Sequence, residues 1–83
     1  MNEEFMRQEG KLAVAKQNAE RLRLRLLGIA RTIRSCLDPT ETDPAKFKSD
    51  IVLAEAFELN KLRADYLAFI AEISEINQYL GRS

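Results

Sequence analysis

The segment LNKLRADYLAFIAEISEINQYL, from Leu59 to Leu80, carries the clearest structural pattern in this chain. Its large apolar residues recur at alternating steps of three and four. They are Leu59, Leu62, Tyr66, Phe69, Ile73, Ile76 and Leu80. This spacing puts them on one face of an α-helix, so it predicts a long helix that packs lengthwise against another helix.

A second group of apolar residues lies on the opposite side of the same predicted helix. Its members are Leu53, Phe57, Ala64, Leu67, Ala68 and Ala71. One neighbouring helix covers only one face, so this second group is left for a further contact. The sequence therefore predicts that the chain assembles with another helical surface.

The N-terminal part of the chain carries a matching repeat. Its positions are Phe5, Gln8, Leu12, Ala15, Ala19, Leu22, Leu26, Ile29, Ile33 and Cys36, of which only Gln8 is polar. Asn2 ahead of Glu3 and Glu4 favours a helix start, because the asparagine side chain accepts from a free N–H and acids suit the positive helix end. We expect a helix over about residues 3–37, roughly 50 Å long at 1.5 Å per residue.

The run DPTETDP, with two prolines and no apolar side chain, is the loop signal between the two repeats. Asp43 and Pro44 are typical of a helix cap and first helical position, because the carboxylate accepts a free N–H and proline has none to leave unpaired. We therefore expect a loop over residues 38–43 and a second helix over about residues 44–80. A start at Ser49 is the alternative.

A short loop makes the two helices antiparallel neighbours. Aligning the two repeats places the small Ala19 opposite the large Phe69, as interdigitated packing requires. It also places Arg25 near Asp65. Gly81 follows the last apolar position and is expected to end the second helix in the left-handed conformation.

The predicted fold is all-α: a single domain over residues 1–83, built as an antiparallel two-helix hairpin of coiled-coil type that dimerises into a four-helix bundle.

Thirteen basic and thirteen acidic residues cancel, so no overall charge draws the chain to nucleic acid or to a membrane. There is no histidine and only one cysteine, which removes the usual general base and zinc ligands. We expect no enzyme activity, no catalytic or metal site and no cofactor. The acidic N-terminal stretch and the lack of a long apolar run predict a soluble, cytoplasmic protein.

Arginines form the sharpest charged feature. They are Arg21, Arg23, Arg25, Arg31 and Arg34, within the segment ERLRLRLLGIARTIR. Helical spacing puts Arg21 and Arg25 on one flank of the packed face and the other three on the other side. The favoured interpretation is that these residues flank a bundle core and pair with acids of the second helix. The alternative is a dimeric RNA- or DNA-binding regulator, similar in outline to the hairpin dimer of Rop, although no residues match and a shared shape does not transfer function.

The favoured functional hypothesis is a non-enzymatic protein–protein interaction module, a small adaptor or a structural or regulatory subunit that acts through helical-bundle assembly. The expected partner is a second copy of the chain or another helical protein. No membrane is expected as a partner. The expected interface residues are Leu24, Leu27, Leu53, Phe57, Leu67 and Ala71.

Overall fold

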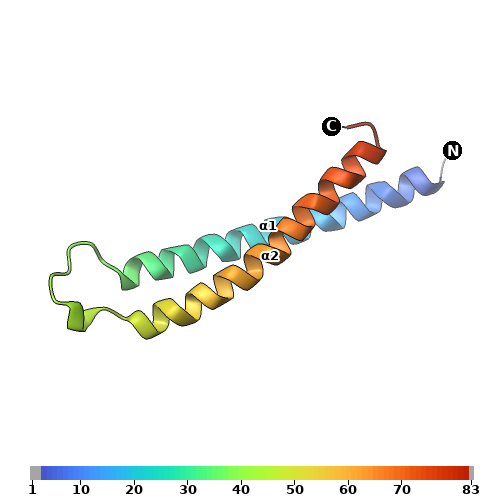
Figure 1. Ribbon diagram of the computed structural model, residues 1–83. Coiled ribbons are helices and arrows are strands. Elements are labelled where there is room, and N and C mark those ends of the chain that lie inside the picture. Colours follow the sequence, from blue (N-terminus) through green and yellow to red (C-terminus); the bar gives the residue numbers. More distant parts are fainter. Residues whose placement is uncertain (1–2, 83) are drawn as a thin grey trace.

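The computed structural model describes residues 3–82 as a long, narrow helical hairpin. Helix α1 spans Glu3–Cys36 and helix α2 spans Ser49–Tyr79, with a short 3-10 helix, η1, at Pro44–Lys46 between them. The two long helices pack against each other, and the first turn of α1 and the last turn of α2 lie opposite the connecting loop (Figure 1). The described residues extend over 66 × 19 × 15 Å and contain no strand. The prediction of an all-α, antiparallel two-helix hairpin is confirmed.

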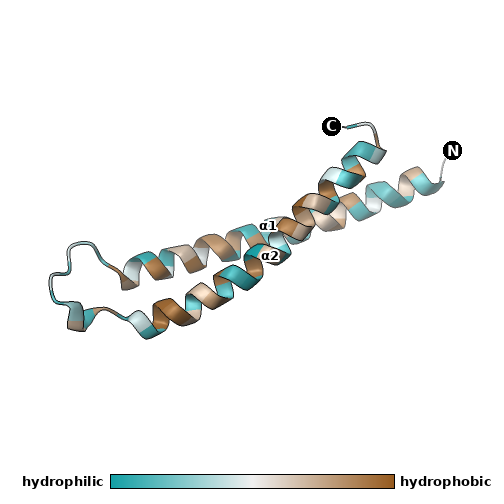
Figure 2. Cartoon of the chain, in the orientation of Figure 1, coloured by the Kyte–Doolittle hydropathy of each residue, from teal (hydrophilic) through white to brown (hydrophobic). Residues whose placement is uncertain are grey.

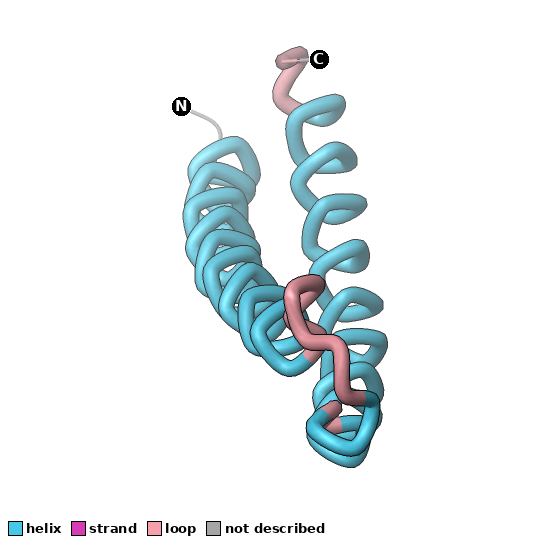
Figure 3. The backbone as a smooth tube through the Cα atoms, turned by 90° about the vertical axis from the view of Figure 1, so that its left-hand side faces the viewer, coloured by secondary structure: helices cyan, strands magenta, loops and turns pink. Residues whose placement is uncertain are grey.

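The core is the seam between the two helices, defined by the two apolar repeats. Its buried members are Leu12, Ala15, Ala19, Ile29 and Cys36 on α1 and Leu62 and Ile76 on α2. Every one of them belongs to the predicted repeats. The other members are half-buried, except Phe5, which is exposed because it lies level with the residues that follow the last turn of α2. The two helices are inclined to each other and do not run strictly parallel, as the two perpendicular views show (Figures 1 and 3).

Helix α2 begins later than residue 44, and this corrects the favoured boundary. Asp43 does act as a cap, with its Oδ1 accepting from the Ala45 N–H at 3.0 Å, but the turn that it caps is η1. Phe47 then leaves the helical conformation at φ −69° and ψ 130°. Ser49, the alternative start, is the first residue of α2. The loop is correspondingly longer than residues 38–43.

Tertiary placement explains this interruption. Phe47 and Lys48 line a hollow at the loop end together with Ser35 and Cys36, the last turn of α1. Phe47 is extended and Lys48 is also non-helical, so the chain runs beside the last turn of α1 before α2 begins. Local capping chemistry favours a helix at Asp43, but it carries no information about this contact.

The C-terminal end of α2 has the predicted geometry. Gly81 has φ 76°, in the left-handed region that glycine adopts without steric cost. The Arg82 N–H donates to the Asn77 carbonyl at 2.7 Å and the Gly81 N–H donates to the Gln78 carbonyl at 3.1 Å. This pair of bonds is a Schellman motif, which satisfies carbonyls at the helix end. The expected cap at Asn2 lies outside the described residues.

Candidate interaction surfaces

The side of each helix that faces away from the seam is its outer face. Leu24 and Leu27 lie on the outer face of α1, where 57% and 42% of their surfaces are exposed. The remaining members of the predicted interface, Leu53, Phe57, Leu67 and Ala71, are exposed on the outer face of α2. Because the seam lies between the helices, the two outer faces point in opposite directions. The hairpin therefore does not gather the six residues into one patch.

The outer face of α2 is the more uniform of the two. Its central positions form the α2 outer stripe: Leu53, Phe57, Asn60, Ala64, Leu67, Ala71, Ser74 and Gln78. All eight are exposed and none is charged, although 31% of the chain is charged. The stripe runs for roughly 37 Å along the helix at 1.5 Å per residue. The predicted interface contained only apolar residues and so lacked the polar members of the stripe, whose shared lack of charge was the signal that would have included them.

The corresponding stripe on α1 is interrupted by charge. Glu20, Arg31 and Arg34 all lie on its outer face, near Leu24 and Leu27. Hydrophobic and hydrophilic residues alternate along the whole of both helices in the hydropathy view (Figure 2). The uncharged continuity of the α2 outer stripe, and not apolar residues as such, therefore distinguishes it from the rest of the surface.

The predicted ion pair of Arg25 is made with a different carboxylate. Arg25 Nη2 lies 2.9 Å from Oε1 of Glu58, whereas Asp65 was expected to be its partner. Glu58 and Asp65 stand seven residues apart on the same flank of α2, so the predicted alignment offers both acids to Arg25. Asp65 lines the same hollow of about 450 Å³ as Arg25 and Arg21. The choice of Asp65 as the ion-pair partner of Arg25 was wrong, although Asp65 does lie near Arg25 as predicted.

The five arginines occupy three separate places. Arg21 and Arg25 share the hollow beside Asp65, while Arg31 and Arg34 share another with Asp38 at the loop end. Arg23 binds Glu20 on its own helix through two hydrogen bonds of 2.8 and 2.9 Å. This contact raises the pKa of Arg23 and lowers the pKa of Glu20. Among residues 3–82, Arg21, Arg31 and Arg34 make no ion pair, so the expected pairing with acids of the second helix holds only for Arg25.

Contacts between the two ends of the described chain were not foreseen. Arg82 forms an ion pair with Glu9 of α1, and its guanidinium carbon lies 6.0 Å from the centre of the Phe5 ring. These residues are more than seventy positions apart, and no local pattern links them. They join the end of α2 to the first turns of α1.

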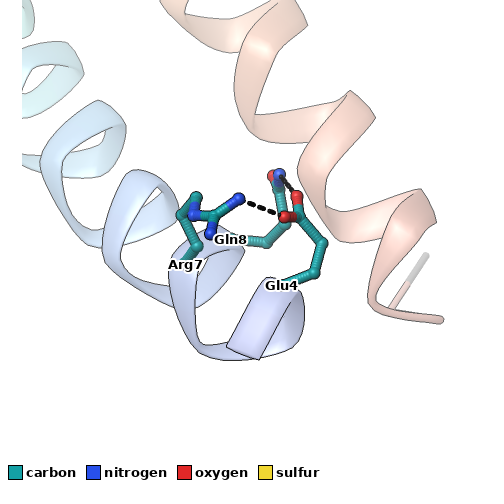
Figure 4. A network of polar contacts seen from close by, with 3 residues as sticks. All are labelled: Glu4, Arg7 and Gln8. Atoms are coloured by element: carbon teal, nitrogen blue, oxygen red, sulfur yellow. Dashed lines mark hydrogen bonds and ion pairs between the residues drawn. The ribbon is translucent and has the colours of Figure 1, made fainter. Parts of the chain in front are cut away.

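A small polar network occupies the first turns of α1 (Figure 4). Gln8 Nε2 donates to Glu4 Oε1 at 2.8 Å and Arg7 Nη1 donates to Glu4 Oε2 at 2.6 Å. The hydrogen bond from Gln8 is the main cause that lowers the pKa of Glu4, with Arg7 and Lys11 adding to it. Gln8, the one polar residue of the α1 repeat, thus bonds within its own helix.

The described residues offer no further built site. No group of three or more His, Cys, Asp or Glu side chains is placed to hold a metal ion anywhere in residues 3–82. Neither α1 nor α2 contains an apolar stretch long enough to cross a membrane. No family model, curated protein or solved structure matches the chain.

Proposed function

We propose that this protein is a non-enzymatic protein–protein interaction module, a small adaptor or a structural or regulatory subunit that acts by helical-bundle assembly. The observation that carries the proposal is the α2 outer stripe, which is exposed along its whole length and free of charge. Its exposed apolar members, flanked by charged residues, are typical of an interface; they are Leu53, Phe57, Ala64, Leu67 and Ala71.

Burial within the hairpin supports the same proposal. Only seven side chains of the described chain are buried, all of them in the seam. Phe57 and Leu53 remain 70% and 60% exposed. A small chain with so thin a core gains stability by covering such side chains, because each large apolar side chain contributes about 1.5 to 3 kcal/mol when it is fully buried. A second pair of helices against α2 supplies that cover.

The test is cross-linking of the full chain in its native host, with and without nuclease. The informative variant is the double substitution Leu53→Gln and Leu67→Gln, which makes the stripe polar without touching the seam. Val14→Gln is the matched control, since Val14 is exposed on α1 outside the stripe. We expect a cross-linked assembly that survives nuclease, persists in the control and is lost in the double variant. Loss on nuclease treatment, or an assembly unchanged in the double variant, contradicts the proposal.

A dimeric RNA- or DNA-binding regulator is the second candidate. It is favoured by Arg31 and Arg34, which lie together at the loop end without an ion pair among the described residues, and by Arg21. Arg23 and Arg25 are already paired with acids. If the first proposal holds, binding to random duplex or structured RNA is no tighter than about 10⁻⁴ M at physiological salt.

Salt dependence decides between the two candidates. A phosphate-binding surface loses affinity with salt at a slope of about −0.9 per duplex phosphate contacted, and replacing Arg31 and Arg34 by Gln flattens that slope by about two units. Sub-micromolar binding with such a slope contradicts the interaction-module proposal and supports the nucleic-acid-binding regulator.

A further inference from the structure

The α2 outer stripe is complementary to itself when a second α2 is laid against it in the opposite direction. In one alignment Phe57 faces Ser74 of the second copy, and Leu67 faces Ala64 of the second copy. By the two-fold symmetry each of these contacts occurs twice. Large side chains meet small ones at both levels, which is the condition for close packing between helices.

We propose that a second copy of this chain covers the α2 outer stripe, with the two α2 helices antiparallel about a two-fold axis near Ala64 and Leu67. This inference rests on the proposed function and names its partner. An interface of this kind is closed and isologous, so it produces a dimer of hairpins and no fibre. The two α1 helices then lie outside the central pair.

Charged residues along the edges of the stripe favour this alignment. Lys61 and Glu75 lie on the same edge, and in this alignment Lys61 of one copy comes beside Glu75 of the other, twice over. Within residues 3–82 neither side chain makes an ion pair, so both are free to do so. Arg63, on the opposite edge, approaches Arg63 of the second copy, and this like-charge contact is the unfavourable one in the arrangement.

The neighbouring alignments are poorer. A shift of one heptad in one direction brings Lys61 beside Ala68 and Glu75 beside Ala54 of the second copy, so neither charge has an opposite partner. The opposite shift leaves Leu53 and Phe57 beyond the overlap, although these are the most exposed large side chains of the stripe. Only the proposed alignment covers both residues and pairs opposite charges.

The surface area of the hairpin fits a dimer of this size. The chain exposes 6356 Å², whereas a compact monomer of 9.5 kDa exposes about 5,000 Å². The excess is about 1,300 Å², and a stable interface of standard size buries about 800 Å² on each partner. A contact along the stripe is therefore sufficient to remove most of the excess.

The decisive measurement is sedimentation equilibrium on the purified full chain at micromolar concentration. We expect twice the mass of 9.5 kDa. Lys61→Glu and Glu75→Lys, each alone, weaken the dimer about tenfold, because two exposed ion pairs become two like-charge contacts. The two changes together restore it, since the pairs are re-formed with the charges exchanged. Arg63→Gln, which removes the contact between like charges, tightens the dimer.

Cross-linking tests the alignment without using charge. Ala68 is exposed and lies close to the two-fold axis, beside Ala68 of the second copy in the proposed dimer, so Ala68→Cys is captured as a covalent dimer by a short bis-maleimide. Ala54→Cys is the matched control: it is exposed on the same edge but far from the axis. The native Cys36 is buried in both variants.

Two results overturn the inference. A purified chain that stays at 9.5 kDa up to about 100 μM rules out the second copy as partner; if the nuclease-resistant assembly in the host nevertheless remains, the interaction-module proposal stands with a different helical partner. A dimer in which Ala54→Cys cross-links and Ala68→Cys does not, with no rescue by exchange of Lys61 and Glu75, contradicts the antiparallel alignment.

Discussion

The inner and outer faces of α2 carry the same three-four repeat, but the hairpin buries only the inner face. On the inner face Leu62 and Ile76 are buried, whereas on the outer face Phe57 and Leu67 are exposed. Large apolar side chains occupy almost every inner position, while the outer stripe combines leucine and phenylalanine with alanine, serine, asparagine and glutamine. Spacing therefore shows that a helix face is suited to packing, whereas the sizes and charges of its side chains limit which surface packs there.

The largest effect is expected from a matched pair of phenylalanines on the two faces. Phe69→Ala removes a half-buried ring from the seam and destabilises the hairpin by about 3 kcal/mol, at the low end for a buried Phe. Phe57→Ala removes an exposed ring and changes the stability of the isolated hairpin little. Urea unfolding at concentrations below the dimer dissociation constant measures both. If Phe57→Ala unfolds the hairpin and Phe69→Ala leaves it folded, the assignment of the inner and outer faces of α2 is inverted.

A smaller effect is expected where α1 has open space beside its backbone. A Cβ added at Gly28 meets no atom within 4 Å, and the same holds at Gly10. Alanine at either position therefore stabilises α1 by up to about 1 kcal/mol, because glycine is the poorer helix former. Thermal unfolding of the two single variants checks this. Destabilisation by Gly28→Ala alone indicates that another surface already covers α1 at that point.

The ion pair at the edge of the seam contributes less. Arg25→Gln is expected to cost about 0.2 to 1 kcal/mol, the range for an exposed pair. The cost disappears when Glu58 is already Gln, because a double-mutant cycle isolates the interaction. Asp65→Asn provides the control background and leaves most of the cost in place. If the cost vanishes only in the Asp65→Asn background, the partner of Arg25 is Asp65, the acid predicted from the sequence.

The smallest effect lies in the loop that joins the helices. The N–H and hydroxyl of Thr40 both donate to Asp38, and they lower the pKa of its carboxyl below the ordinary value of 3.8. A lowered pKa in the folded state stabilises the fold above pH 3.8 and loses this contribution as pH falls through the folded pKa. We expect Asp38→Asn to flatten the acid-side loss of stability slightly, in unfolding measured from pH 5 to pH 2. An unchanged pH profile shows that the turn keeps these contacts in the unfolded chain.

Much of the hairpin was predictable because helical geometry is local. The repeats located all seven buried residues, and the proline-rich run located the loop. Gly81 was predicted correctly as the helix terminator, since a left-handed residue after the last helical turn favours glycine. The exposure of Leu53 and Phe57 also followed, because one partner helix covers one face.

Contacts between distant residues were not predictable in the same way. The cap at Asp43 has the correct chemistry, yet α2 begins only at Ser49, after the non-helical Phe47 and Lys48, which line a hollow with Cys36. The pairing of Arg82 with Glu9 depends on where two chain ends meet. Sequence spacing alone does not show which rotamer a long side chain adopts.

The two helices, their order and the faces that they turn toward each other follow from the sequence, because each depends on residues three or four positions apart along one backbone. Tertiary structure alone decided the start of α2, the choice of Glu58 by Arg25 and the separation of the five arginines. These features depend on distances between residues of different elements, where several acids or several chain paths satisfy the same local pattern. Packing of the whole hairpin selects one of them.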